Sequence, residues 1–447
     1  MATRANHGLM QWIDARFPLT ETWENHVSKY FTPTNFNIWY YFGSLAMLVL
    51  VIQLVSGIFL TMHYKPDATE AFDSVESIMR DVNWGWFIRY MHSTGASAFF
   101  IVIYVHMFRG LMYGSFKTPR ELIWIIGMLI YLALMAESFM GYLLPWGQMS
   151  YWGAQVIVNL FSTIPVIGQE LVLWIRGDYV VSDATLSRFF ALHVALVPLA
   201  LIGLVVAHIS ALHMVGSNNP DGVELKKDKN NKDFVPAGSV PFHPYYTIKD
   251  TFGAVAFLLV FCAVLFFIPD MGGLFLEPDN FIPADPLATP EHIAPVWYFT
   301  PFYSILRAVP SVPTPFPGVL AMGAAVIVLF FLPWIDRNPV RSVRYRSPLH
   351  KLNLLIFVAI FIALGYLGTQ PVSPVRTELA ARYAEIYFLF FFVLSIYSRA
   401  RSALYRIAWF VVLLAVVTIL DWLRYTGETA KLISMTWFIP AVYLAVM

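Results

Sequence analysis

The chain has 447 residues, of which 58% are hydrophobic and only 13% are charged. A soluble globular protein carries about 25% charged residues, so this composition excludes an ordinary soluble domain and indicates a polytopic membrane protein. The formal net charge of +1 provides no basic surface of the kind that nucleic acids require, and nucleic acid is not an expected partner.

The segment before the first apolar run, residues 1–37, is predicted to lie at the membrane surface. Charges occur throughout it and it lacks the short apolar core of a secretory signal, so we expect no cleavage. Its stretch LMQWIDARFPLTETW, residues 9–23, is typical of an amphipathic segment that anchors a chain to lipid.

Apolar runs long enough to cross a bilayer predict an all-α bundle of transmembrane helices. They occur at about 38–62, 87–112, 121–142, 188–214, 251–269, 318–335, 351–368, 380–398 and 404–423, and a weaker run fills 432–447. Alternate loops carry the basic residues, namely Lys117 and Arg120, then Lys226, Lys227, Lys229 and Lys232, then Arg337, Arg341, Arg344 and Arg346, and finally Arg399, Arg401 and Arg406. The positive-inside rule therefore predicts a cytoplasmic N-terminus.

Two of the apolar runs each carry two widely spaced histidines. His92 and His106 lie in RYMHSTGASAFFIVIYVHMFRG, residues 89–110, and a helix would separate them by about 21 Å on nearly the same face. His193 and His208, in the run near 188–217, would be separated by about 22 Å, also on one side. Two such helices can face each other histidine to histidine.

This spacing predicts two stacked bis-histidine haem sites. Neutral imidazole is a preferred axial ligand of haem iron, and two imidazoles fill both axial positions, which suits electron transfer. The alternative is that intramembrane histidines only form hydrogen bonds between helices. Four histidines at matched separations favour ligands, because ionisable groups inside a bilayer are costly and are usually functional.

Glycines repeat the same spacing. Gly43 and Gly57 lie fourteen residues apart in one apolar run, and Gly127 and Gly141 do so in another. A residue without Cβ lets a flat ring approach the backbone closely, although ordinary helix packing also recruits glycine. Together with the histidines, the pairs predict four helices around two haems. The single cysteine, Cys262, excludes covalent CxxCH attachment, so each haem must be held non-covalently.

Arg89 and Arg109 each lie three residues from a histidine, one helical turn closer to the membrane surface. Such an arginine can neutralise a haem propionate, which would otherwise be costly at that depth. The alternative is an interfacial arginine whose charged end simply reaches the headgroups.

Long motifs in the chain resemble those of cytochrome b from the respiratory cytochrome bc complexes (complex III). They are GYLLPWGQMSYWGA at 141–154, HMVGSNNPDG at 213–222, PFHPYYTIKD at 241–250 and PVWYFTPFYSILRAVP at 295–310, and the likeness runs from about residue 30 to about 370. The resemblance implies eight core helices, followed here by one or two additional C-terminal ones. It suggests a surface segment (1–37), a haem-binding bundle (38–218), a cytoplasmic loop (219–249), a second helical region with the outer quinol-site loop (250–398) and a transmembrane extension (399–447).

The resemblance also implies a quinol-oxidising site at the outer face, where the common form of the motif has a proton-accepting glutamate. Here that position is Val296, which cannot accept a proton. We hypothesise that Glu291 or His292, just upstream, takes over this role, since quinol oxidation must release two protons. The site residues implied by resemblance are Pro295, Trp297, Tyr298, Tyr142, Tyr303 and Ala154.

The same family has a quinone-reducing site at the inner face, and its positions correspond here to His213, Asp250, Lys249 and Ser44. An imidazole and a carboxylate at the end of a bundle can deliver protons to a reduced quinone ring. Without the resemblance, Asp250 could equally be a cap at the start of a helix.

We therefore predict the quinol-handling subunit of a proton-motive quinol:cytochrome c oxidoreductase in a bacterial inner membrane. Its expected partners are a Rieske-type iron–sulfur protein, a cytochrome c-type subunit, quinone, lipid and a second copy of the complex. The alternatives are a polytopic transporter, which would not need four histidines at these separations, and a haem-binding subunit whose outer site is inactive, which would explain Val296.

Overall fold

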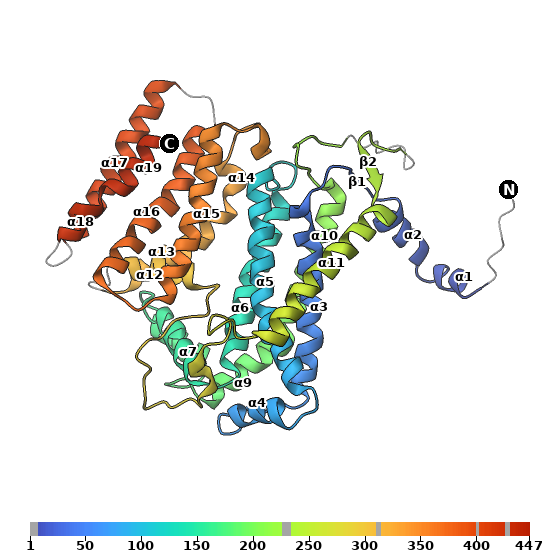
Figure 1. Cartoon of the computed structure of the whole chain (residues 1–447), viewed down its shortest axis with the longest axis horizontal. Helices are drawn as coiled ribbons and strands as arrows, with labels where there is room; N and C mark the ends of the chain where they lie inside the picture. The colour runs from blue at the N-terminus through green and yellow to red at the C-terminus, as the bar shows by residue number, and fades with distance from the viewer. Residues whose placement is uncertain (1–7, 226–233, 310–313, 399–401, 425–429) are drawn as a thin grey trace.

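The computed structural model describes residues 8–225, 234–309, 314–398, 402–424 and 430–447, and it is mostly helical (Figure 1). The first half contains α1 (Leu9–Asp14), α2 (Leu19–Trp23), α3 (Tyr41–Thr61), α4 (Ala71–Arg80), α5 (Gly85–Tyr113), α6 (Glu121–Leu143), α7 (Gln148–Phe161), α8 (Gly168–Arg176), α9 (Asp183–Ala191) and α10 (Val197–Val215). The second half contains α11 (Phe242–Phe267), α12 (Thr300–Ala308), α13 (Phe316–Phe330), α14 (Leu332–Ile335), α15 (Pro348–Thr369), α16 (Pro374–Tyr397), α17 (Ala403–Arg424), α18 (Ala430–Thr436) and α19 (Phe438–Val446).

Short elements complete the described chain. Two are π-helical turns, η1 (Glu24–Ser28) and η3 (Leu192–Leu196), and three are 3₁₀ turns, η2 (Ile38–Tyr40), η4 (Pro278–Phe281) and η5 (Val343–Tyr345). The strands β1 (Phe31–Pro33) and β2 (Ser239–Pro241) pair antiparallel, with Thr32 opposite Val240.

Eight helical segments of the described chain are long and apolar enough to cross a membrane. They are 38–61, 85–113, 121–143, 183–215, 242–267, 348–369, 374–397 and 403–424. This confirms the predicted all-α polytopic bundle. α11 starts earlier than the run at 251–269 predicted, so the last part of the expected 219–249 loop is helical.

Two predicted runs are interrupted by proline. The run at 318–335 forms α13 and the one-turn α14, which break at Phe331 because Pro333 has no N–H and its ring clashes with the carbonyl of Leu329. The run at 432–447 forms α18 and α19 for the same reason, since Pro440 lies four residues after Thr436.

The four histidines lie on two long helical segments in the middle of the molecule. α3 packs along α5, and α6 packs along α10, which continues α9 and η3 as one segment from Asp183 to Val215. α11 packs against both α3 and α5 (Figure 1). The bundle therefore brings α5 and the 183–215 segment into one four-helix unit, with α3 and α6 between them.

The chain's connections gather at the two ends of this bundle. At the predicted outer end, the loop after α6 meets the loop after α11, where the backbone N–H of Ala284 donates to the carbonyl of Trp146 at 3.0 Å. At the predicted inner end lie β1, β2 and the N-terminal segment, whose exposed α1 and α2 agree with a surface location. The basic residues Lys226, Lys227, Lys229 and Lys232, and also Arg399 and Arg401, fall outside the described residues.

A buried ion cluster joins the two halves at the inner end. Nζ of Lys117 lies 3.0 Å from Asp336, and a nitrogen of Arg346 lies 2.6 Å from the other oxygen of the same carboxylate. Burial alone would raise the pKa of Asp336, but the two cations outweigh burial and hold this pKa below its usual value. Asp336 therefore remains ionised and fixes the loop after α5 to the loop before α15.

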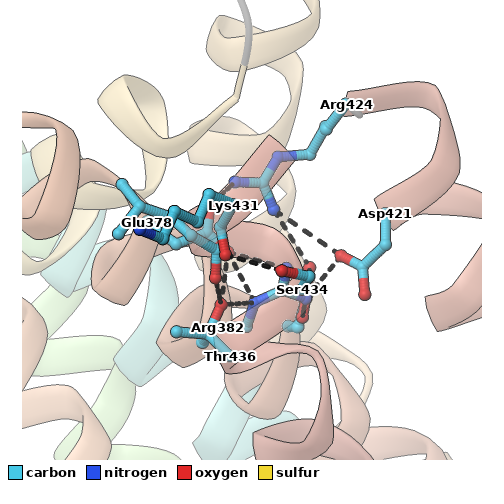
Figure 2. Close-up of polar contacts among 9 residues, drawn as sticks. Glu378, Arg382, Asp421, Arg424, Lys431, Ser434 and Thr436 are labelled. Atoms are coloured by element: carbon cyan, nitrogen blue, oxygen red, sulfur yellow. Dashed lines mark hydrogen bonds and ion pairs between the residues drawn. The ribbon is translucent and has the colours of Figure 1, made fainter. Parts of the chain in front are cut away.

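A second buried ion cluster attaches the C-terminal helices (Figure 2). The guanidinium of Arg382 on α16 is fully buried and binds Glu378 at 2.7 Å, Glu385 at 3.0 Å and also Asp421 of α17. Arg424 of α17 pairs with Glu378, whose carboxylate also accepts a hydrogen bond of 2.9 Å from Thr436 of α18. The cluster therefore fixes α17 and α18 against α16.

We expect Arg382→Met to detach α17 from α16, because it leaves three carboxylates without their central cation. Removing one partner of a buried ion network costs about 3–5 kcal/mol. Hydrogen exchange of residues 403–424 in the purified membrane protein should rise strongly. Leu404→Ala, at a residue of the same helix that is 77% exposed, is the control and should leave exchange unchanged. Equal exchange in the two variants would contradict the role given to the cluster.

Candidate functional site

The two histidine pairs predicted from the sequence face each other inside the bundle. The ring centroids of His92 on α5 and His193 in η3 lie 6.1 Å apart, and those of His106 on α5 and His208 on α10 lie 6.4 Å apart. A metal–imidazole bond is about 2 Å long and the ring centre lies about 1 Å beyond the nitrogen, so two ligands of one iron have centroids about 6 Å apart. Each pair therefore fits a bis-histidine haem iron.

Each of the four predicted glycines lies against one of these imidazoles. A Cβ at Gly43 would come within 3.3 Å of Cε1 of His106, one at Gly57 within 3.2 Å of Cε1 of His92, and one at Gly127 within 3.2 Å of Cε1 of His208, while Gly141 lies closest of all, against His193. The matched spacing of glycines and histidines thus has a steric cause. The glycines of α3 and α6 make room for the imidazoles of the neighbouring helices.

Two side chains that sequence patterns did not predict orient the outer pair. Nδ1 of His193 lies 2.9 Å from both the backbone carbonyl and a carboxylate oxygen of Glu137, and Nδ1 of His92 lies 3.0 Å from Oγ of Ser56. A ring that donates from Nδ1 leaves Nε2 available to a metal. Ser56 lies next to Gly57 in the sequence, and Glu137 lies one helical turn before Gly141. This proximity to the spaced glycines is a signal that could have identified both residues.

The two predicted arginines have buried nitrogen atoms without a hydrogen-bond partner among the described residues. These atoms are Nη1 of Arg89 and Nε of Arg109. A buried donor left unpaired costs about 1–3 kcal/mol, so such atoms fit a site that receives a carboxylate from a bound group. Arg109 also lies against its histidine, with a nitrogen 3.5 Å from Nδ1 of His106.

A cavity of about 360 Å³ extends from the His106–His208 pair to the inner end of the bundle. Its lining includes all four residues predicted for the inner quinone site, namely Ser44, His213, Lys249 and Asp250. These residues come from α3, α10 and α11, which are far apart in sequence. The alternative that Asp250 caps a helix is wrong, because α11 already begins at Phe242.

The N-terminal segment covers part of this cavity. The ring of Tyr30 stacks on His213 with centroids 4.3 Å apart, and Nδ1 of His26 in η1 lies 2.8 Å from Nδ1 of His213. Neither residue was predicted, since nothing in the N-terminal sequence indicates that this segment folds back onto α10.

A larger cavity, of about 610 Å³, lies at the outer end. Four of the predicted outer-site residues line it, namely Glu291, His292, Pro295 and Trp297. The other four are not among its lining residues. Tyr298 stacks on Phe100 at 3.9 Å, Tyr303 donates to the carbonyl of Ile293 at 3.3 Å, Ala154 packs beside Trp146, and Tyr142 reaches the cavity through Glu277.

The turn that carries Val296 is fixed against α5. Nε1 of Trp297 donates to Oγ of Ser97 at 3.1 Å, and the hydroxyl of Tyr104 donates to the carbonyl of Tyr298 at 2.5 Å. Val296 itself is only 4% exposed and packs in the hydrophobic core, and it is not part of the cavity lining. The same helix therefore positions the outer cavity and the outer histidine, His92.

Glu277 is a half-buried residue whose carboxyl group lies in the lining of the outer cavity. It accepts a hydrogen bond of 2.7 Å from the hydroxyl of Tyr142 on α6. Burial raises the pKa of the Glu277 carboxyl to about 7, and the Tyr142 hydrogen bond only partly opposes this. Glu277 was not predicted from the sequence, because it lies nineteen residues before Val296 and only the folded loop brings it to the cavity.

Two family models match the chain. The model described as cytochrome b/b6/petB covers residues 27–216, and the one described as cytochrome b(C-terminal)/b6/petD covers 283–389. The chain is also 62% identical over 393 residues to a cytochrome b of Allochromatium vinosum, a match that spans 87% of this chain and 95% of the relative. The chain belongs to the cytochrome b family.

Other relatives support the assignment to the cytochrome b family. A cytochrome b of Rhodospirillum rubrum is 50% identical, over 88% of this chain and 93% of the relative. A solved hyperthermophilic respiratory complex III contains a chain that superimposes with a TM-score of 0.79 at 40% identity, covering 87% of this chain and 98% of that one. The helices α17–α19 lie beyond both family models, the second of which ends at residue 389.

Membership of the cytochrome b family defines the protein's general activity. The family binds haem b, oxidises quinol and transfers electrons across the membrane as part of complex III, an oxidoreductase. The chain is accordingly an integral membrane protein of respiratory electron transport. The predicted function and resemblance are thereby confirmed at the level of the family.

Proposed function

We propose that the chain holds two non-covalent haem b groups, the outer one between His92 and His193 and the inner one between His106 and His208. Bound haem supplies one-electron redox chemistry. The observation that carries the proposal is the pair of ring separations, 6.1 and 6.4 Å, which fit two axial ligands of one iron at each level. α5 spaces the two levels by about 20 Å.

We further propose that Arg89 and Arg109 bind the haem propionates. Their unpartnered buried nitrogens support this role, since a propionate would satisfy each donor and the arginine would neutralise the carboxylate. Gly43, Gly57, Gly127 and Gly141 act by leaving space for the ligand rings, and Glu137 and Ser56 orient the outer ones.

Quinol oxidation is proposed to occur in the outer cavity beside Pro295 and Trp297. Oxidation removes two electrons and two protons from quinol, so the cavity must contain a proton acceptor. Glu277 has the properties required, because it lines the cavity and a carboxyl with a pKa of about 7 is partly ionised at neutral pH. Glu291 and His292 line the same cavity and remain the alternative predicted from the sequence.

Quinone reduction is proposed to occur in the inner cavity. Two electrons and two protons convert quinone to quinol, and His213 and Asp250 are the groups that can supply the protons there. Lys249 and Ser44 complete the polar lining around the quinone headgroup. Oxidation at one face and reduction at the other release protons outside and take them up inside, which couples electron transfer to proton translocation.

The chain can perform this cycle only within a complex. We propose a Rieske-type iron–sulfur protein as the acceptor of one electron from quinol, with a cytochrome c-type subunit beyond it, while the other electron crosses the membrane through this chain. The complex is proposed to be a homodimer, embedded in lipid of a bacterial inner membrane with the N-terminus of the chain in the cytoplasm.

Turnover from quinol to cytochrome c, measured in the native complex together with haem b reduction, tests this function. We expect fast turnover with two reducible b-type haems. Reducible haems with negligible turnover would instead support a haem-binding subunit with an inactive outer site, the second candidate that Val296 suggests. Family membership leaves the transporter alternative without support.

Gly141→Ala is expected to weaken haem binding at the outer pair, because the added Cβ would overlap the imidazole of His193. A reduced-minus-oxidised spectrum should show that about half of the b-type signal is lost or shifted in potential. Gly203→Ala is the matched control, since a Cβ at that glycine meets no atom within 4 Å and should leave both signals intact. An unchanged spectrum in Gly141→Ala would count against the assigned ligand pair.

The pH dependence of quinol oxidation should report the ionisation of Glu277. Because burial raises its pKa to about 7, its proton-accepting form increases as pH rises through 7, and the wild-type rate should rise with it. Glu277→Gln retains an acceptor for the Tyr142 hydrogen bond but cannot take a proton, so the rate should fall about 100-fold and lose this pH step. Glu277→Asp should restore part of the rate.

Three further variants separate Glu277 from the other groups of the cavity. Asp279→Asn, Glu291→Gln and His292→Ala each remove a titratable group from the lining. If Glu277 is the acceptor, Glu291→Gln and His292→Ala should keep the wild-type pH step. Asp279→Asn should keep a step but move it to lower pH, because the charge of Asp279 helps to raise the pKa of Glu277. Loss of the step in Glu291→Gln or His292→Ala, with normal behaviour of Glu277→Gln, would return the role to the residues predicted from the sequence.

A further inference from the structure

His26 and His213 form a hydrogen-bonded pair between the inner cavity and solvent. Their Nδ1 atoms lie 2.8 Å apart and their ring centroids 5.0 Å apart. His213 is half-buried and lines the cavity, whereas His26 is exposed and is not among the lining residues. The pair thus has one ring in contact with the cavity and the other in contact with water.

Aromatic contacts hold the N-terminal segment in the position that makes this pair. Trp23, at the end of α2, packs edge to face on His243 with centroids 5.6 Å apart. Tyr30, after η1, stacks on the ring of His213 with an interplanar angle of 9°. His26 lies between Trp23 and Tyr30 in the sequence, so these two aromatic contacts hold its ring beside His213.

Several charged and titratable groups lie near the pair. On the N-terminal segment these are the Glu24–Lys29 ion pair, joined at 2.6 Å, and the phenol of Tyr30. α11 contributes His243 beneath Trp23, and Lys249 and Asp250 inside the cavity. Arg109 and Arg120 also line this cavity, and the charge of Arg120 acts on the Tyr30 phenol, so the cavity that His213 lines contains groups of both signs.

We propose that His26 takes up protons from water at the inner face and passes them through His213 to quinone in the inner cavity. This inference rests on the proposed function of that cavity. His26 acts through His213 and touches no substrate itself. Asp250, which lines the same cavity, is left to supply the second proton that quinone reduction requires.

The transfer conserves protons at each step. A short Nδ1–Nδ1 contact means that one ring donates the proton and the other accepts it, so the pair holds one proton between the rings when both are neutral. Uptake of a proton at Nε2 of His26 makes the pair singly charged, and the shared proton can then move to His213. Release of the Nε2 proton of His213 to the reduced quinone returns the pair to neutrality.

The experiment follows reoxidation of pre-reduced haem b by added quinone in the purified complex, without oxygen. A short-chain ubiquinone and a short-chain menaquinone are each used as the oxidant. We expect His26→Gln to slow reoxidation about tenfold at pH 8, where protons are scarce, and less than twofold at pH 6. In His26→Ala, added imidazole should restore the rate, because the position is open to solvent.

His63→Gln is the control. It removes an exposed imidazole that neither lines the cavity nor anchors the N-terminal segment, so rate and pH profile should stay as in the wild type. A wild-type rate and pH profile in His26→Gln would overturn the relay. A loss that is equal at all pH values and is not restored by imidazole would also overturn it, because it would show that His26 only holds the segment in position.

The wild-type complex separates failure of this inference from failure of the proposed function. If neither quinone reoxidises haem b in the wild type, the function proposed for the inner cavity is wrong, and the relay falls with it. If the wild type responds and the His26 variants behave as the wild type does, only the relay is wrong.

Discussion

Two pairs of imidazoles, each with ring centroids little more than 6 Å apart, set the arrangement of the helical bundle. Such rings can be held at that separation only if the two helical segments that carry them stay the same distance apart at both histidine pairs. Glycines on α3 and α6 make this possible, because a side chain at those positions would occupy the volume of the ligand ring. The spacing of fourteen or fifteen residues on all four helices follows from that single requirement.

The two cavities differ in the titratable groups that are placed to carry protons. The outer cavity contains a carboxyl group whose burial raises its pKa to about 7, so Glu277 can accept a proton near neutral pH and lose it again. At the inner face a solvent-exposed imidazole is hydrogen bonded to one that lines the cavity. A carboxyl group such as Glu277 suits the release of protons from a quinol. The His26–His213 pair suits the uptake of protons for a quinone. Both depend on segments outside the four helices that carry the paired histidines and glycines.

Buried ions hold the second half of the chain together, although its helices lack the histidine pairs of the first half. Lys117, Arg346 and Asp336 attach the two halves at the inner end, and Arg382 with its carboxylates attaches α17 and α18 to α16. A charge inside a low-dielectric region is costly unless it is paired, so such clusters define one relative position of the helices. The C-terminal extension therefore has a specific docking site within this chain.

The sequence by itself determined the all-α fold, the four histidines, their glycines and arginines, and the inner polar group. These follow from helical periodicity and from the cost of polar residues in a membrane, both of which are local properties of a chain segment. Only the tertiary structure brought three pairs of residues together, namely Glu277 with Tyr142, Glu137 with His193 and His26 with His213. It also placed the side chain of Val296 in the hydrophobic core. Each of these contacts joins segments that are far apart in sequence and irregular in conformation, so no periodic pattern encodes them. Their partners are set by how loops and the N-terminal segment pack on the finished bundle.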